Sequence, residues 1–199
     1  MDGPTTRPTA SAFGELEPSE SERLGRLGGI LVLAGTAVGF PASLAIEPPP
    51  GLADHVITLL GVLSGLLLLV LPWRRISPVW FHVVILAGVL EVTVATAVYS
   101  HDFSFYYVIV AAYAAYIVRE ARVLRLYEAL FTVALLAPLA YVGDQREHLH
   151  HVLVILPVLL IVAVIVRHLR DSVEARERRY REFALEAAEL SARLETGAR

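Results

Sequence analysis

One acidic side chain lies in the middle of an apolar run. Glu91 is near the centre of the run from Trp80 to Tyr99, which is long enough to cross a bilayer. An ionised carboxylate at that depth costs at least a few kcal/mol, so it indicates a ligand-binding or proton-sensing group, or a neutral acid hydrogen-bonded between helices. Hydroxyl groups at a similar depth in other runs are Thr36, Ser64, Tyr113 and Thr132. We predict a sensing site of Glu91, Tyr113 and Thr132, and without a second acid it does not indicate an enzyme.

Histidines form a second group of candidate side chains, at the ends of three apolar runs. They are His55, His101, His148, His150 and His151. Neutral imidazole is a good ligand for zinc or copper, and its protonation can report pH. Because His148 and His151 share a helical face, they are the centre of a predicted metal site. The alternative is that all five are solvated residues at a wet interface.

Tyrosines and glycines in these runs indicate close helix contacts. Three tyrosines share a stripe that either lines a small-molecule pocket or anchors the helix at the interface: Tyr106, Tyr113 and Tyr116. Small residues spaced four apart form two pairs: Gly35 with Gly39, and Gly61 with Gly65. Such pairs let helix backbones approach closely, within one bundle or across a dimer.

The elements that must position these groups are six apolar runs. They extend from Leu27 to Ile46, Ala53 to Pro72, Trp80 to Tyr99, Ser104 to Val118, Val123 to Val142 and Leu149 to Val166. A span needs about 20 apolar residues, so the fourth run is short. The mean hydropathy is +0.59 and 56% of residues are apolar, which excludes a soluble domain. We predict an all-α polytopic membrane protein with six transmembrane helices.

Arginines predict the orientation of this bundle. They flank alternate loops: Arg23, Arg26, Arg74, Arg75, Arg119, Arg122, Arg125, Arg167 and Arg170. The intervening loops hold only Arg146. This positive-inside asymmetry predicts a multi-pass protein of the inner (cytoplasmic) membrane with both termini in the cytoplasm. The sequence contains no lysine and no cysteine, which excludes Schiff-base and thiolate chemistry and cysteine-ligated metal.

After the last run, the apolar pattern continues into a charged C-terminal segment. Residues repeat alternately every four and three positions along a predicted dimer seam: Val166, Leu169, Val173, Arg176, Tyr180, Phe183, Ala187, Leu190 and Leu194. A sustained period of 3.5 residues predicts a left-handed coiled coil, in which Arg176 occupies a d position. The alternative is one amphipathic helix that lies on the membrane or folds against cytoplasmic loops. We therefore divide the chain into a disordered cytoplasmic tail (1–22), a six-helix sensor domain (23–166) and a coiled-coil signalling helix (167–199).

Two stretches carry a family resemblance. The segment from Phe105 to Tyr116 reads FYYVIVAAYAAY, and the segment from Arg167 to Glu174 reads RHLRDSVE. With the intervening arginine-rich turn and two spans, they resemble the N-terminal six-helix membrane sensor region of bacterial diguanylate cyclases. In that family a signalling helix leads into a GGDEF catalytic domain. The sequence has no GGDEF signature, so the resemblance implies an output enzyme outside this chain and assigns no catalytic residue here.

Two classes of function follow from the sequence. The first is a sensory and dimerising input module, which forms a homodimer and passes a signal through its last helix to a cytoplasmic output domain or protein. The second is a small transporter or channel, although the two halves lack the matched polar breaks of inverted repeats. We expect the lipid bilayer as a partner, and neither a cofactor nor nucleic acid.

Overall fold

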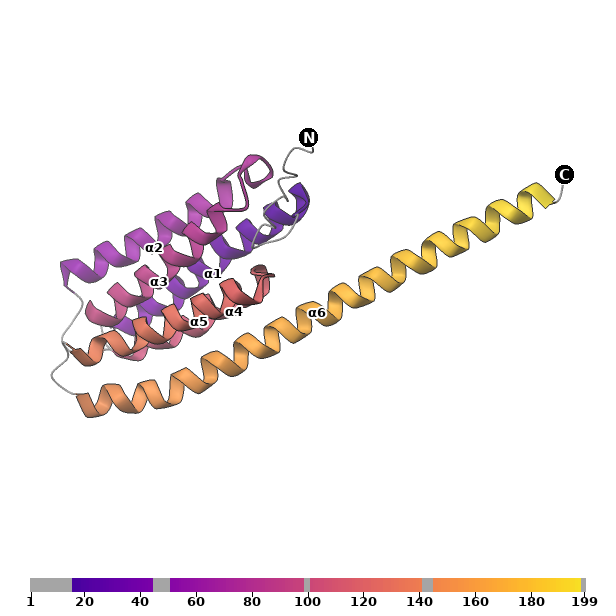
Figure 1. Ribbon diagram of the computed structural model, residues 1–199. Helices are drawn as coiled ribbons and strands as arrows, with labels where there is room; N and C mark the ends of the chain where they lie inside the picture. The colour runs from indigo at the N-terminus through magenta and orange to yellow at the C-terminus, as the bar shows by residue number, and fades with distance from the viewer. Residues whose placement is uncertain (1–15, 45–50, 99–100, 141–144, 198–199) are drawn as a thin grey trace, which may run out of the picture.

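The chain is a bundle of α-helices from which the last helix projects (Figure 1). This computed structural model describes residues 16–44, 51–98, 101–140 and 145–197, except for the side chains of 42–43, 53–54, 98, 101–102, 145–147 and 189–197. No strand occurs in these ranges. The helices are α1 Pro18–Leu44, α2 Leu52–Val70, η1 Trp73–Arg75, α3 Trp80–Val98, η2 His101–Phe105, α4 Tyr106–Ile117, α5 Ala121–Leu136, η3 Ala137–Ala140 and α6 Gln145–Gly197. The all-α prediction is confirmed.

Among the described residues, four helices are long and apolar enough to cross a membrane. The stretches that contain a sufficiently apolar window are Pro18–Pro41, Trp80–Ala97, Ala121–Ala140 and His148–Ala188, the last of which continues into the charged part of α6. The apolar segments of α2 and α4, His55–Val70 and Phe103–Ile117, lie in the same bundle but are shorter. The chain is therefore a helical protein suited to a membrane.

Successive helices alternate in direction, so the arginine-rich segments meet at one end (Figure 1). The start of α1, the α2–α3 turn, the α4–α5 turn and the exit of α6 lie at this end, which we call the charged end. Ion pairs join them: Glu22 with Arg74, and Glu20 with Arg119 at 3.0 Å. These contacts draw the first turn of α1 onto the bundle. The helix begins at Pro18, a residue favoured in a first helical turn, so the prediction of disorder is wrong for residues 18–22, and residues 1–15 lie outside the described ranges.

Glycines allow α1 and α2 to pack backbone against backbone. A Cβ on Gly29 would lie 2.8 Å from the Gly65 carbonyl oxygen, and one on Gly65 would lie 3.2 Å from that of Gly29. Gly25 is covered by the ring of Trp73, whose Nε1 donates to the Leu68 carbonyl at 2.7 Å. The α1–α2 hairpin is thus held together by the Gly29–Gly65 backbone contact and by the contact of Trp73 with Gly25 at the charged end. Small residues allow such close contacts in apolar bundles.

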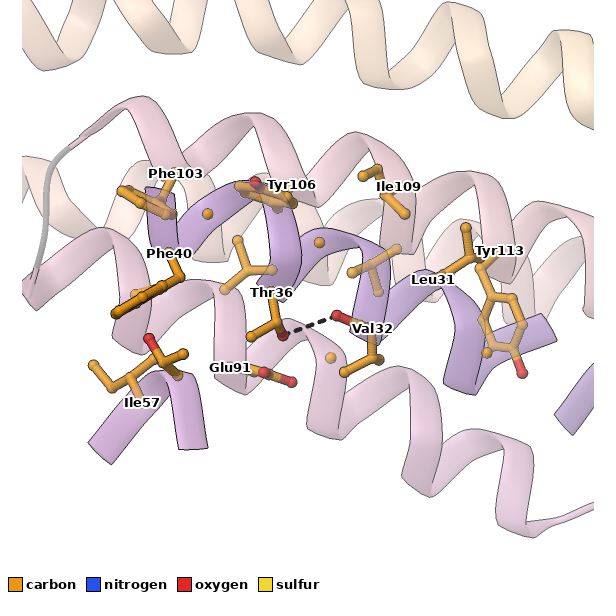
Figure 2. Close-up of a pocket in the computed structure, with 18 of the residues that line it drawn as sticks. Leu31, Val32, Thr36, Phe40, Ile57, Glu91, Phe103, Tyr106, Ile109 and Tyr113 are labelled. Carbon is orange, nitrogen blue, oxygen red and sulfur yellow. Dashed lines mark hydrogen bonds between the residues drawn. The ribbon is translucent and has the colours of Figure 1, made fainter. Parts of the chain in front are cut away.

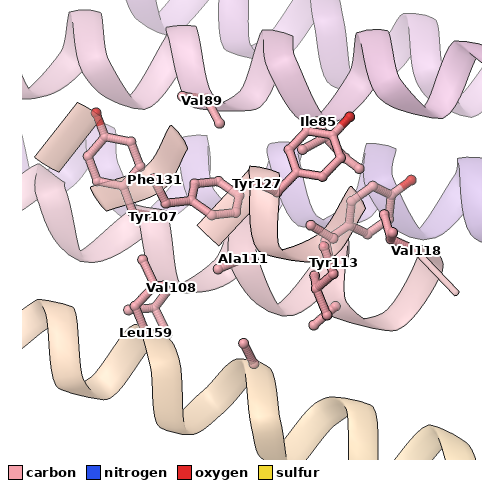
Figure 3. Close-up of a cluster of buried hydrophobic side chains, with 14 of the residues drawn as sticks. Ile85, Val89, Tyr107, Val108, Ala111, Tyr113, Val118, Tyr127, Phe131 and Leu159 are labelled. Carbon is pink, nitrogen blue, oxygen red and sulfur yellow. The ribbon is translucent and has the colours of Figure 1, made fainter. Parts of the chain in front are cut away.

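Helix α4 forms the centre of the remaining bundle (Figure 3). Most of its residues are buried: Tyr107, Val108, Ala111, Tyr113, Ala114, Ala115 and Ile117. Its alanines let neighbouring helices approach, and Val108 lies beside Leu159 of α6. Tyr107 has a hydrogen bond of 2.6 Å to Thr93 of α3. Because α4 is enclosed by its neighbours, a displacement of α4 must be transmitted to them.

Helix α6 is one continuous element of 53 residues. At 1.5 Å per residue it is about 80 Å long, and its C-terminal part extends well beyond the bundle. No break separates the predicted domains at residues 166 and 167. The apolar and charged parts of α6 are therefore one continuous helix, which contains Pro157 in its apolar part.

Candidate functional site

A narrow cavity lies within the apolar part of the bundle (Figure 2). Its volume is about 120 Å³, and we call it the Glu91 slot. It is lined by α1, α2, α3, η2 and α4, with these residues: Gly28, Leu31, Val32, Gly35, Thr36, Gly39, Phe40, Ile57, Thr58, Val84, Gly88, Glu91, Val92, Ala95, Phe103, Tyr106, Ile109, Val110 and Tyr113. The lining is mostly hydrocarbon, as in typical small-molecule sites, with a few polar groups.

Glycines on one face of α1 make room for the aromatic side chains of this slot. A Cβ on Gly28 would lie 2.7 Å from the Tyr113 hydroxyl, and one on Gly35 would lie 3.3 Å from the Tyr106 ring. Gly39 similarly faces Phe103 at 3.2 Å. The predicted Gly35–Gly39 pair therefore receives rings from η2 and α4 within the bundle, whereas Gly61 and Gly65 face α1.

Glu91 is the acidic residue of the slot. A Cβ on Gly61 of α2 would lie 2.7 Å from Glu91 Oε1 and 2.5 Å from Thr36 Oγ1, so both oxygens lie over this glycine. Thr36 donates its hydroxyl proton to the Val32 carbonyl at 2.9 Å, and its oxygen can still accept (Figure 2). Among the residues that the structure describes, the Glu91 carboxyl has no hydrogen-bond or ion-pair partner. It is therefore a half-buried polar group that is open to interaction with a ligand.

The three predicted sensing residues do not all converge. Tyr113 shares the slot with Glu91, and its hydroxyl donates to the Leu24 carbonyl at 3.0 Å. Thr132 lies on α5, outside the slot, and donates to the Glu128 carbonyl at 2.8 Å. The grouping of Thr132 with Glu91 is therefore wrong, because equal depth in the membrane does not fix which way a helix faces.

Other polar candidates are also distributed differently from the prediction. Ser64 donates to the Gly61 carbonyl at 3.1 Å and does not line the slot. Tyr106 lines the slot and Tyr116 does not, so the tyrosine stripe is a pocket wall over part of its length. The glycine face of α1 was not predicted as a site, although its spacing of seven and four residues, which keeps Gly28, Gly35 and Gly39 on one side of the helix, is the signal that marks it.

The histidines do not gather around a common point in the part of the chain that is described. His148 is fully buried, with Nε2 3.0 Å from the Leu135 carbonyl oxygen. The rings of His150 and His151 meet edge to face at 6.3 Å, and His55 lies by Phe40 at 6.1 Å. The side chain of His101 lies outside the described residues. No three His, Asp or Glu side chains that are described come together as a metal site.

A cluster of charged residues ties α6 to α4 at the charged end. We call Glu20, Arg119, Arg170 and Glu174 the α6 clamp. Arg170 Nη1 donates to three carbonyl oxygens at the C-terminus of α4: those of Ala115 and Tyr116 at 3.3 Å and of Val118 at 2.9 Å. Its side chain is only 10% exposed. A guanidinium here satisfies carbonyls that have no helical partner and lies at the negative end of the helix dipole.

The remaining clamp residues extend the connection to α1. Arg119, just after α4, pairs with Glu20 of α1 at 3.0 Å and lies 3.8 Å from Glu174 of α6. Glu174 also lies 3.7 Å from Arg170 Nε. Three segments distant in sequence are thereby joined where α6 leaves the bundle.

Beyond the clamp, the predicted dimer seam is not covered by any of the residues that the structure describes. Val166 is half-buried, and the side chains from Leu169 to Ala187 at seam positions are exposed, Tyr180 by 73% and Phe183 by 66%. Leu169 and Val173 line an open groove of about 870 Å³ between the start of α1 and α6. The side chains of Leu190 and Leu194 lie outside the described residues. Comparisons of the chain with protein-family models, curated proteins and solved structures find no match.

Proposed function

We propose that this chain is a membrane-embedded sensory and dimerisation input module, which reads occupancy of the Glu91 slot and passes it through α6 to a cytoplasmic output. One observation carries the proposal: α4 forms a wall of the slot with Tyr106 and Tyr113, and it is bonded to α6 through Arg170. The slot and the projecting helix therefore share one rigid neighbour. A ligand can shift such an element only by its differential affinity for two positions of α4.

The topology that this function needs is six spans with both termini in the cytoplasm of a bacterial inner membrane. It is supported by the alternating direction of the helices and by the arginines gathered at the charged end. A cytoplasm-active reporter should be active after Arg75, Arg122 or Arg199 and silent after Pro50 or Asp144. Activity after Pro50 with silence after Arg199 would exclude this topology.

The output requires a dimer of the projecting helix. Tyr180 and Phe183 leave much of their apolar surface exposed. In water, covering that surface stabilises the protein by about 25 cal/mol for each Å² that is buried. A second copy supplies the matching period of 3.5 residues. Cysteines at the seam positions Val173 and Ala187 should cross-link better than cysteines at the outward positions Asp171 and Arg178. Equal cross-linking would contradict the dimer.

A fused enzyme tests whether α6 transmits the signal. We expect a diguanylate cyclase catalytic domain, joined after Arg199, to show activity that depends on the phase of α6. Insertion of one residue after Ala188 should change this activity, and insertion of a full heptad should restore it, because a heptad preserves the seam. Activity that is indifferent to both insertions would contradict transmission through α6.

Glu91 variants test the sensing site in the same fusion. Glu91→Gln retains the hydrogen-bonding shape and removes the titrating proton, whereas Glu91→Leu removes both. If Glu91 senses, both variants hold the output in one state with normal amounts of folded protein. Unchanged output in both would remove Glu91 from the proposal and leave transport as the alternative.

A further inference from the structure

We propose that the Glu91 slot binds a single-chain amphiphile, an alkyl chain with one hydroxyl or amine group that donates a hydrogen bond to the Glu91 carboxyl. The inference rests on the proposed function only in taking this slot as the sensing site. It adds the chemical class of the ligand. Three properties of the slot carry it: its shape, its apolar lining and its one unpartnered acid.

The shape fits a chain better than a ring system. The slot follows α1 from Gly28 to Phe40, a rise of about 18 Å, within a volume of about 120 Å³. A compact apolar cavity of similar volume, about 150 Å³, holds one benzene. The same volume drawn out along three turns of helix is narrow. An alkyl chain fills it, and a fused-ring ligand does not.

The apolar walls favour a ligand that is hydrocarbon along most of its length. Branched apolar side chains line the slot: those of Leu31, Ile57, Val84 and Val110. On the glycine face of α1, which has no side chains, the backbone of α1 itself forms the wall. Each buried methylene contributes roughly 0.8 kcal/mol relative to water. A ligand with several polar groups would leave most of them without partners in this lining.

The acid selects the polar end of the ligand. Glu91 Oε1 and Thr36 Oγ1 both lie over Gly61. The Thr36 hydroxyl proton is already donated to the Val32 carbonyl, so it is not available to Glu91. The carboxyl therefore needs a donor, which a hydroxyl or an amine provides. A fatty acid would place a second carboxyl beside Glu91, and the two groups could lie together only if at least one of them kept its proton, which a hydroxyl or amine ligand does not require. An alkane would leave Glu91 unpaired.

Photolabelling of the full chain in nanodiscs tests this assignment. The probe is an octanol that carries a diazirine, and labelled positions are mapped by mass spectrometry. We expect labels on slot-facing residues of α1 and α4. Octanol and octylamine should compete at concentrations about tenfold lower than octane, the factor expected for one hydrogen bond to an acid. Equal competition by octane would overturn the proposal and indicate a lipid acyl-chain site.

Three variants locate the determinants. Glu91→Leu should abolish the tenfold preference for octanol over octane, and Glu91→Gln should preserve the preference for octanol but weaken that for octylamine. Gly35→Leu fills the slot and should prevent labelling, whereas Ala34→Leu on the neighbouring exposed position should not. Circular dichroism checks that each variant is folded. An unchanged preference in Glu91→Leu, or labelling that survives Gly35→Leu, would overturn the assignment.

The fused output separates this inference from the proposed function. Slot labelling with an output that ignores octanol would keep the ligand class and contradict sensing. An output that depends on the phase of α6, without slot labelling, would keep the input module and overturn the ligand class.

Discussion

The two halves of α6 carry the same repeat but bury it differently. In the inner half, Ile155 and Leu159 are buried against the bundle, with Leu159 fully covered beside Val108 of α4. In the outer half, Tyr180 and Phe183 occupy equivalent positions and are largely exposed. The inner stripe is satisfied by the chain itself. The outer stripe is not covered by the described residues, and under the proposed function a second copy covers it.

Exposure also has a different meaning on the two halves. Ile161 and Val164 are exposed on the inner half, where lipid chains are as apolar as the side chains and exposure costs little. An exposed Phe183 in water costs the free energy of its apolar surface. The comparison teaches that, in this helix, equal exposure is compatible with lipid contact on one side of Arg170 and supports the proposed dimer on the other.

The largest expected effect is on the proposed dimer seam in the outer half of α6. Phe183→Asp places a charge at the centre of the proposed seam in both copies, and a buried unpaired charge costs several kcal/mol. We expect the dissociation constant of the dimer to rise at least about a hundredfold. Light scattering of the full chain in nanodiscs measures it. Arg178→Asp, on the outward face, is the matched control and should remain dimeric, as should the wild type; a monomeric wild type would contradict the seam.

A cavity in the inner half of α6 should weaken its packing against α4 without affecting the outer half. Leu159→Ala should lower the free energy of unfolding by about 3 kcal/mol, because a fully buried leucine leaves a cavity against α4. The lipid-facing control Ile161→Ala should cost less than about 1 kcal/mol. Unfolding in mixed micelles by increasing denaturing detergent compares the two. Equal losses would mean that α6 does not pack on α4 through Leu159.

The sequence predicts the helices better than it predicts their facing directions. Long apolar runs and arginine asymmetry each depend on one segment, so the element order and the charged end could be predicted. The site depends on how helices rotate around their axes, so Tyr113 joins Glu91 while Thr132 faces elsewhere. Gly61 is a second case, because its missing side chain leaves room on α2 for both Thr36 Oγ1 and Glu91 Oε1. No local sequence pattern predicts that Thr36 and Glu91 both lie over Gly61.

The α6 clamp could not be predicted from local sequence patterns either. Arg170 reads in the sequence as one of several arginines that mark the cytoplasmic side. The structure places its guanidinium over the C-terminal carbonyls of α4, where Val118 leaves the helical conformation with ψ of 115°. That role follows only from the tertiary position of α6 relative to the α4–α5 turn.

The clamp marks the boundary between the two halves, and its removal sharpens the comparison. Arg170→Gln removes charge-assisted hydrogen bonds to three carbonyls and should destabilise the chain by about 2 kcal/mol. It should also uncouple the fused output from octanol while the dimer persists. Arg178→Gln is the matched control, since the hydrogen bond that Arg178 makes among the described residues stays within its own helix, to the Glu174 carbonyl at 3.4 Å. Amide hydrogen exchange in α4 and the output assay measure both effects, and normal coupling in Arg170→Gln would contradict the clamp as the link.

The smallest expected effect concerns Arg176, the polar residue of the outer seam. Two guanidinium groups that face each other at a d position repel and resist desolvation, so the seam holds together less tightly than an apolar one. Tyr180, one turn further along, offers a ring face that partly offsets this cost through a cation–π contact. Arg176→Leu should therefore tighten the dimer by about tenfold, whereas Arg178→Leu on the outward face should leave its dissociation constant unchanged. Sedimentation of the full chain in nanodiscs over a concentration series compares the two. A seam held near balance is one that a ligand of modest affinity can switch, so Arg176→Leu should also fix the fused output in one state; a weaker dimer in this variant would place Arg176 outside the seam.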